Sequence, residues 1–371
     1  MIEFIFILLF CLLLLCYSVI LVYLRKGLTR LKKPDSAEHL SVSVIVPAHN
    51  EEKTLPRLLY SLQSQNYPEY LTEIILVDDR SDDQTLKLME HFAQQKSNVK
   101  IISIKNTLPN ISPKKRAIKE AIRKAQHDII ITTDADALPG KKWIKSHVAL
   151  YTENTGMVLG YAPYRTDPPF NSLFHKILSL EYFTMGSVTA ATAGLGFPLT
   201  CNGANLSYRK KIFNDIGGFG NSIKWLSGDD DLLMHRIKQK SDADITFTAS
   251  ESAAVYNDPP RNFSSFVRQR IRFSSKHIAY PLKIKLFLSL IYLFYLFLAG
   301  TIIFIFLAHA FLPLLLASLF IKISAELQFL IPANRLLEKR KLVWYYPLAF
   351  IPHIFYIVIF PVLGLLMPKK W

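Results

Sequence analysis

The sequence predicts an α/β domain with a mostly parallel sheet, joined to transmembrane α-helices at both ends. Between residues 40 and 275, short β-branched runs alternate with segments whose leucines keep helical spacing. Outside this region lie nearly uncharged apolar runs, and about 20 apolar residues suffice to cross a bilayer. Half of the 371 residues are hydrophobic and 20% are charged, which excludes a disordered chain and an ordinary soluble protein.

The N-terminal apolar run from Ile2 to Tyr23 carries no charge except Glu3. We expect residues 1–24 to be a retained transmembrane anchor, because a cleaved signal peptide has its positive charge before the apolar core, not after it. Lysine and arginine beside a span stay preferentially in the cytoplasm. The domain at 40–275 is therefore predicted to be cytoplasmic, in an integral protein of a bacterial inner or plasma membrane. The basic flank consists of Arg25, Lys26, Arg30, Lys32 and Lys33.

The C-terminal region 276–371 is expected to contain an interfacial helix and transmembrane helices at 286–308, 310–331 and 342–367. The last of these runs is interrupted by prolines and ends in Lys369 and Lys370. A single crossing would place these lysines outside, against the charge rule. The segment either breaks that rule or re-enters as a bent hairpin, and the sequence leaves both open.

The net charge of +15 is compatible with nucleic acid, an anionic membrane surface or a polyphosphate ligand. Much of the excess lies beside the apolar runs, where an anionic cytoplasmic leaflet accounts for it. We therefore expect a membrane partner and no nucleic acid. The three cysteines give no disulfide framework and no thiolate zinc site, as is typical of a reducing compartment.

Four buried strands and three helices are predicted in the first half of the α/β domain. Strand, helix and strand in repetition indicate a parallel sheet with both faces covered. The strands are expected at Val42–Val46, Ile74–Val77, Val99–Ile104 and Ile129–Thr132, and the helices at Glu51–Gln63, Gln84–Gln95 and Lys114–Lys124.

Acidic loops follow three of these strands, at 47–52, 78–83 and 134–136. Each loop alone could simply cap a helix. Together their carboxylates would meet at one edge of the sheet, where they repel one another unless a cation lies among them. Asp134 and Asp136 are placed to offer oxygens to a hard ion, so we expect Mg²⁺ or Mn²⁺ as cofactor.

These motifs resemble, in chain order, those of the family 2 glycosyltransferases of the GT-A fold. The resemblance extends from about Val42 to Phe273 and is to the membrane-embedded branch with cellulose and hyaluronan synthases and ceramide glucosyltransferase-like enzymes. Two positions depart from the family pattern: Arg80 stands where a glycine is frequent, and Phe273 replaces a tryptophan. The matching segments are VIVPAHNEE at 44–52, VDDRSDDQT at 77–85, KKRA at 114–117, TDAD at 133–136, CNGAN at 201–205, GDDDL at 228–232 and QRIRF at 269–273.

The resemblance implies a role for each matching residue. Asp229 corresponds to the general base and Asp136 to the metal ligand, while Asp231 and Phe273 would contact the acceptor. Without the resemblance, we would interpret the acidic run at 229–231 as a helix N-terminus and the basic run at 268–276 as an interfacial helix. The residues implied to bind the nucleotide sugar are Pro47, His49, Glu51, Asp79, Lys115, Asp134, Gly203, Gln269 and Arg272.

The activity implied is metal-dependent, inverting transfer of a sugar from a nucleoside diphosphate donor, expected to be a UDP-sugar, to a hydroxyl of a lipid or glycan. The motifs do not distinguish UDP-glucose, UDP-GlcNAc and GDP-mannose. A processive polysaccharide synthase and a polyprenyl-phosphate glycosyltransferase remain enzymatic alternatives. A catalytically silent membrane partner that binds nucleotide sugar is the alternative outside enzymes.

Overall fold

Seven strands form one central sheet within the part of the chain that the computed structural model describes, residues 2–34, 40–305, 309–338 and 340–367. The strands of this sheet are β1 (Val42–Ala48), β2 (Thr72–Asp79), β3 (Val99–Ile104), β4 (Ile129–Thr132), β6 (Thr155–Gly160), β7 (Leu206–Arg209) and β8 (Asp244–Thr248). Two short strands, β5 (Leu138–Pro139) and β9 (Val255–Tyr256), pair antiparallel in a second sheet.

The central sheet has the order β3-β2-β1-β4-β7-β6-β8. Its first four strands are parallel, β7 is antiparallel to both of its neighbours, and β8 is parallel to β6. The predicted α/β class with a mostly parallel sheet is confirmed. The sequence located β1 to β4 correctly, whereas β6, β7 and β8 were not predicted.

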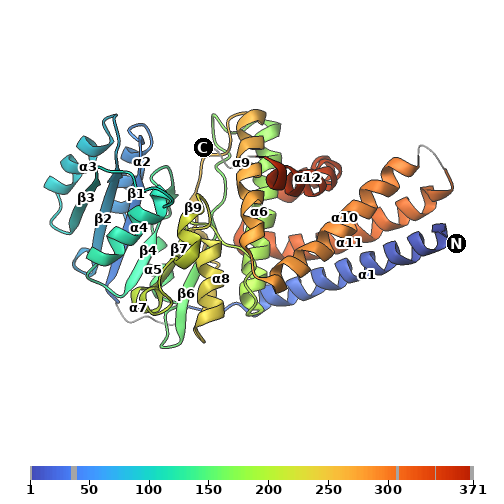
Figure 1. Cartoon of the computed structure of the whole chain (residues 1–371), viewed down its shortest axis with the longest axis horizontal. Helices are drawn as coiled ribbons and strands as arrows, with labels where there is room; N and C mark the ends of the chain where they lie inside the picture. The colour runs from blue at the N-terminus through green and yellow to red at the C-terminus, as the bar shows by residue number, and fades with distance from the viewer. Residues whose placement is uncertain (1, 35–39, 306–308, 339, 368–371) are drawn as a thin grey trace.

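Helices cover both faces of this sheet (Figure 1). Alternate residues of β1 point to opposite sides: Val44 and Val46 pack in the core that includes α2, while Ile45 packs in the core that includes α4. The loops after β1, β2 and β4 share one edge because these strands are parallel. The helices of the domain are α2 (Leu55–Gln63), α3 (Thr85–Gln94), α4 (Pro113–Lys124), α5 (Trp143–Val148), α6 (Leu173–Gly194), α7 (Lys210–Asp215), α8 (Asp231–Lys240) and α9 (Phe263–Ser275).

Helix α6 was not predicted, and it connects the α/β domain to the apolar N-terminal helix α1 (Ile2–Thr29). The two helices approach most closely at glycines. A Cβ added to Gly27 would lie 2.0 Å from the Ala191 carbonyl oxygen, and one added to Gly194 would lie 2.0 Å from the Gly27 carbonyl oxygen. Small residues at both positions therefore allow backbone contact between the helices.

Four apolar helices in the described ranges are long enough to cross a membrane. They are α1, α10 (Leu282–Phe304), α11 (Leu312–Leu337) and the helix that includes α12 (Tyr346–Leu366). Helices α1, α10 and α11 extend side by side away from the sheet, whereas α12 is seen end-on between them and α9 (Figure 1). The predicted interfacial helix corresponds to α9, which ends at Ser275 and so lies before the expected boundary at 276.

Helix α12 is continuous despite Pro352 and Pro361, so the bent hairpin considered above is not formed. Just before it, Arg340 donates from Nη1 to the Tyr164 carbonyl oxygen at 2.7 Å. Near its end, a Cβ on Gly364 would lie 2.6 Å from Cβ of Ser274 in α9. The helix thus begins and ends beside the α/β domain. Lys369 and Lys370 lie outside the described residues.

Candidate active site

A cavity of about 660 Å³ opens at the carboxyl edge of β1, β2 and β4. It collects residues from segments far apart in the sequence, and these include every predicted site residue except Lys115 and Asp231. The predicted residues that line it are Pro47, His49, Glu51, Asp79, Asp134, Asp136, Gly203, Asp229, Gln269, Arg272 and Phe273.

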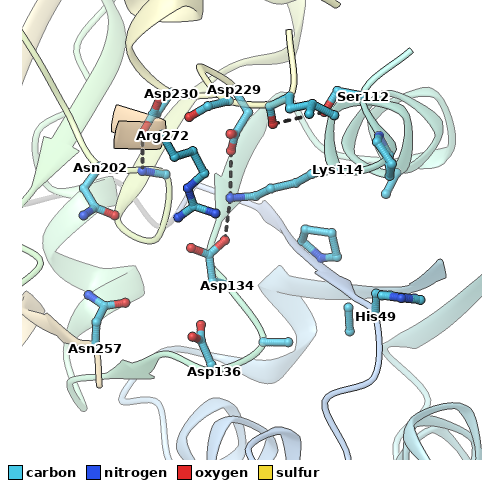
Figure 2. A pocket seen from close by; sticks show the side chains of 18 of the residues that line it. His49, Ser112, Lys114, Asp134, Asp136, Asn202, Asp229, Asp230, Asn257 and Arg272 are labelled. Atoms are coloured by element: carbon cyan, nitrogen blue, oxygen red, sulfur yellow. Dashed lines mark hydrogen bonds and ion pairs between the residues drawn. The ribbon is translucent and has the colours of Figure 1, made fainter. Parts of the chain in front are cut away.

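The side chain of Lys114 crosses this cavity between two acidic loops (Figure 2). Its Nζ lies 2.6 Å from Oδ1 of Asp134 and 2.8 Å from Oδ2 of Asp229. Burial favours the neutral amine, but the two carboxylates outweigh it and hold the pKa of Lys114 well above its usual value. A permanent positive charge therefore links the expected general base to the expected donor-binding aspartate.

Gly203 leaves the space in which this bridge forms. A Cβ at this position would lie 2.9 Å from Oδ2 of Asp229 and 3.3 Å from Nζ of Lys114. Any other residue would therefore displace the Asp229 carboxylate, and this steric demand accounts for a glycine here. The Gly203 backbone N–H also donates to Oδ2 of Asp230 at 3.2 Å.

A second bridge lies beside the first. Nζ of Lys276 lies 2.7 Å from Oδ2 of Asp231 and 3.4 Å from Oδ1 of Asp230. The hydroxyl of Tyr280 also donates to Asp231, whose side chain is fully buried. Asp231 is not among the lining residues of the cavity, and it holds Lys276 from behind. Its expected contact with the acceptor stays a prediction that this geometry does not support.

The expected donor contact of Lys115 likewise stays a prediction that the geometry does not support. Its Nζ donates to the backbone carbonyl oxygens of Ser222 at 2.6 Å and Ser227 at 2.8 Å, and its side chain is fully buried. Adjacent residues of a helix are about 100° apart, so α4 directs Lys114 into the cavity and Lys115 into the protein. Burial lowers the pKa of Lys115 to about 8.

The loops after β1 and β2 form the wall opposite α9. Nδ1 of His49 lies 2.7 Å from the backbone oxygen of Asp79, and Nε of Arg80 donates to Oδ1 of Asp79 at 2.8 Å. Arg80 has a φ of +60°, so this arginine adopts the left-handed conformation that a glycine would take easily. Burial raises the pKa of Glu51, and the charge of Asp134 adds to the effect.

Helix α9 contributes the basic and aromatic wall. Oε1 of Gln269 accepts a hydrogen bond from the Tyr164 hydroxyl at 2.9 Å, which fixes the amide toward the cavity. The guanidinium of Arg272 lies 5.5 Å from the ring centroid of Phe273, within cation–π range. Arg270, between them, is fully buried and paired with Glu181, so one arginine of the motif is structural.

The acidic residues of the cavity fit a divalent cation that is bound partly by the protein and partly by the phosphates of a donor. Among the described residues, no three His, Cys, Asp or Glu side chains come together as a metal site. The carboxylates of Asp134 and Asp136 line the cavity, and they would be the protein's share of the ligands. Magnesium is commonly held by one or two carboxylates plus substrate phosphates and water. Burial raises the pKa of Asp136 to about 6, with the charges of Asp134 and Glu51 adding to it, and a cation would relieve this repulsion.

Several lining residues were missed from the sequence. Lys114 could have been found because it precedes Lys115 in the same basic helix start. Tyr164, Tyr182 and Lys276 carry no local signal, since they belong to a loop, the unpredicted α6 and the turn after α9. Their place in the cavity depends on the tertiary fold.

The mostly parallel sheet, with an acidic, lysine-bridged cavity at its carboxyl edge, is the arrangement expected of a GT-A fold. The family model described as Glycosyl transferase family 2 matches residues 43–217. Residues 43–217 therefore form a family 2 glycosyltransferase domain.

Curated relatives share parts of the chain. The probable glycosyltransferase YdaM of Bacillus subtilis (strain 168) is 27% identical over 237 residues, 63% of this chain and 54% of that protein. The undecaprenyl-phosphate 4-deoxy-4-formamido-L-arabinose transferase of Proteus mirabilis (strain HI4320) is 34% identical over 139 residues, 37% of this chain and 42% of that protein. The chain thus matches about half of the length of these relatives.

A solved structure shares the fold over the whole chain. The mannosyltransferase PcManGT from Pyrobaculum calidifontis, in complex with GDP-Man and Mn²⁺, superposes with a TM-score of 0.61 at 20% identity. The match covers 98% of this chain and 99% of that one. The membrane-helix region is therefore part of the shared fold.

Proposed function

We propose that this protein transfers a sugar from a nucleoside diphosphate donor to a hydroxyl of a lipid or short glycan, with inversion, at the cytoplasmic face of a membrane. The observation that supports this most directly is the Lys114 bridge, which sets Asp134 and Asp229 around one cavity. Asp134 and Asp136 are the candidate donor and metal side, and Asp229 is the candidate base.

The reaction follows from this placement. Asp229 takes the proton from the acceptor hydroxyl, whose oxygen attacks the anomeric carbon from the face opposite the nucleotide. The bond to the diphosphate breaks, and the nucleoside diphosphate leaves with the electron pair. Lys114 and Arg272 supply positive charge beside the cavity wall where that negative charge would develop.

Asp136, with Asp134, would hold Mg²⁺ or Mn²⁺. The ion would supply charge neutralisation at the diphosphate. A relative with GDP-Man and Mn²⁺ in its structure supports a divalent requirement. UDP-sugars are the first donors to test, and that same relative makes GDP-mannose the second.

A polyprenyl-phosphate acceptor is the second candidate. The relative from Proteus mirabilis is named as an undecaprenyl-phosphate transferase, and this supports the alternative. The two proposals differ in the attacking atom, which is a hydroxyl oxygen in the first and a phosphate oxygen in the second. Mild acid distinguishes the two products, because it cleaves a glycosyl phosphate and leaves a glycoside intact.

The test is sugar transfer by the purified full-length protein in detergent with Mn²⁺. Radiolabelled UDP- and GDP-sugars are each incubated with a membrane lipid extract. We expect label in an organic-soluble product, and Asp229→Asn lowers kcat at least about 100-fold while the donor Kd stays within about threefold. Asp215→Asn, an exposed aspartate at the end of α7, is the matched control.

Other outcomes would overturn this proposal. Label found only in a water-soluble polymer of high mass would support a polysaccharide synthase. Donor binding without transfer to any acceptor would support a silent nucleotide-sugar-binding partner.

A further inference from the structure

A second cavity of about 1170 Å³ adjoins the first along α9. The two cavities share the wall formed by Gln269, Arg272 and Lys276. We call the second cavity the basic cavity. Its lining also includes Lys224, Trp225, Arg261, Arg268, Ile271 and Met367.

The charge of this cavity is strongly one-sided. Five lysines and arginines line it, but Asp258 is the single acidic residue among its described lining. That aspartate is already paired, because its Oδ1 lies 3.1 Å from Nη1 of Arg57 and 3.1 Å from Nη1 of Arg165. The cavity therefore has a net positive charge.

Three of its cations have no carboxylate partner within the described ranges, namely Lys224, Arg261 and Arg268. Arg268 instead contacts a hydroxyl, donating from Nη1 to Oγ of Ser264 at 2.9 Å. Like charges gathered around a cavity repel one another, and an anion bound among them would reverse that cost. Phosphate is an anion that arginine forks and lysine ammonium groups bind well.

The cavity also has an apolar border on the side of the membrane helices. Met367, directly after α12, and Ile271 of α9 both line it. Helix α12 is an apolar candidate span whose two ends contact the α/β domain, and it lies against α9 (Figure 1). A ligand with its charged group in this cavity could extend apolar chains along α12.

We propose that the basic cavity binds the phosphate group of an anionic lipid, and that this lipid is the acceptor. This inference rests on the proposed function and specifies its acceptor class. The phosphate stays intact and bound to Lys224 and Arg268, while a hydroxyl of the same head group reaches through the shared wall to Asp229. A lipid fits better than a soluble phosphate, because the cavity joins a cationic lining to an apolar helix end.

Binding can be tested without any sugar transfer, using tryptophan fluorescence of the full chain in detergent. Trp225 lines the cavity, and Trp225→Phe identifies its share of the signal. Three probes are titrated: dioctanoyl phosphatidic acid, dioctanoylglycerol and glycerol 3-phosphate. We expect phosphatidic acid to bind at least about tenfold more tightly than either of the others.

Removing two positive charges from the basic cavity is the second part of the experiment. Lys224→Gln with Arg268→Gln should raise the Kd of phosphatidic acid about tenfold or more and leave the donor Kd unchanged. The matched control is Lys87→Gln with Arg123→Gln, which removes the same charge from exposed positions on α3 and α4. These helices lie at the end of the domain far from α12 (Figure 1).

Each remaining outcome contradicts the inference in a different way. Equal binding of dioctanoylglycerol would show that phosphate is not recognised, and equal binding of glycerol 3-phosphate would indicate a soluble ligand. An unchanged Kd in the double variant would place the lipid elsewhere. Because these measurements need no turnover, they can succeed or fail independently of the proposed transferase activity.

Discussion

The protein pairs lysines with carboxylates in two regions, and the two clusters differ in access. In the candidate active site, the partly exposed Lys114 joins Asp134 and Asp229 beside an open cavity. Among the apolar helices, Nζ of Lys322 lies 2.8 Å from Oε2 of Glu326, and this pair is enclosed.

The enclosed pair is also saturated with hydrogen bonds. Tyr17 of α1 and Tyr295 of α10 donate to Oε1 of Glu326, and Tyr346 of α12 donates to Oε2. One carboxylate of α11 thereby connects all four apolar helices. Buried polar groups in a membrane region are costly unless paired, so this cluster has the properties of a structural connection.

The comparison shows that residue type alone does not distinguish a reacting group from a structural one. Both clusters consist of lysine and acid, but only in the first do the carboxylates face a cavity that a ligand can enter. Substitutions in the enclosed cluster should therefore change stability, and those in the open cluster should change activity.

The largest effect is expected from Glu326→Gln, which leaves the fully buried Lys322 without its counter-charge. Breaking a buried ion pair costs about 3–5 kcal/mol in free energy of unfolding. The melting temperature in detergent, followed by fluorescence, should fall by more than about 5 °C.

A second substitution tests whether the unpaired charge of Lys322 causes this loss of stability. Lys322→Met added to Glu326→Gln removes the unpaired charge and keeps an amide oxygen for the tyrosines, so about half of the loss or more should return. If Glu326→Gln alone melts like the parent protein, the ion pair does not stabilise the helices.

The next effect is expected from Lys114→Met in the open cluster. Loss of the bridging charge should lower kcat/KM for sugar transfer about 100-fold, with little change in melting temperature. Lys115→Met is the neighbouring control and should stay within about threefold in kcat/KM, because Lys115 faces backbone carbonyls outside the cavity. Equal losses in the two variants would contradict the assignment of Lys114.

The smallest effect concerns Lys115 itself, a buried lysine with carbonyl partners. Its pKa is lowered from 10.5 to about 8 by burial. Between these values the unfolded chain keeps a proton that the folded chain has released, so stability rises with pH. Between pH 8 and 9.5, the free energy of unfolding of the parent protein should therefore rise by about 1 kcal/mol relative to that of Lys115→Met. The difference between their melting temperatures, measured across this pH range, should grow accordingly. A difference that is constant over this range would contradict the lowered pKa.

Much of the first half of the domain could be predicted from sequence, because its signals are local. The β-branched runs at 99–104 and 129–132 coincide with β3 and β4, and the acidic loops after β1, β2 and β4 meet as expected. Helix α6 was missed because its mixture of alanine, threonine and aromatic residues shows no clear polar face. Strands β6, β7 and β8 were missed because glycine or polar residues interrupt them, whereas β4 begins with three consecutive isoleucines.

The sequence by itself determined the alternation of strands and helices, the apolar helices and the chemistry gathered at the carboxyl edge, since each depends on residues close together in the chain. Tertiary structure decided which of Lys114 and Lys115 reaches the cavity, why Asp231 lies behind Lys276, and how Glu326 connects four helices. Tertiary structure also placed both ends of α12 beside the α/β domain. These features depend on contacts between residues tens to hundreds of positions apart, and no local pattern of charge or hydrophobicity contains them.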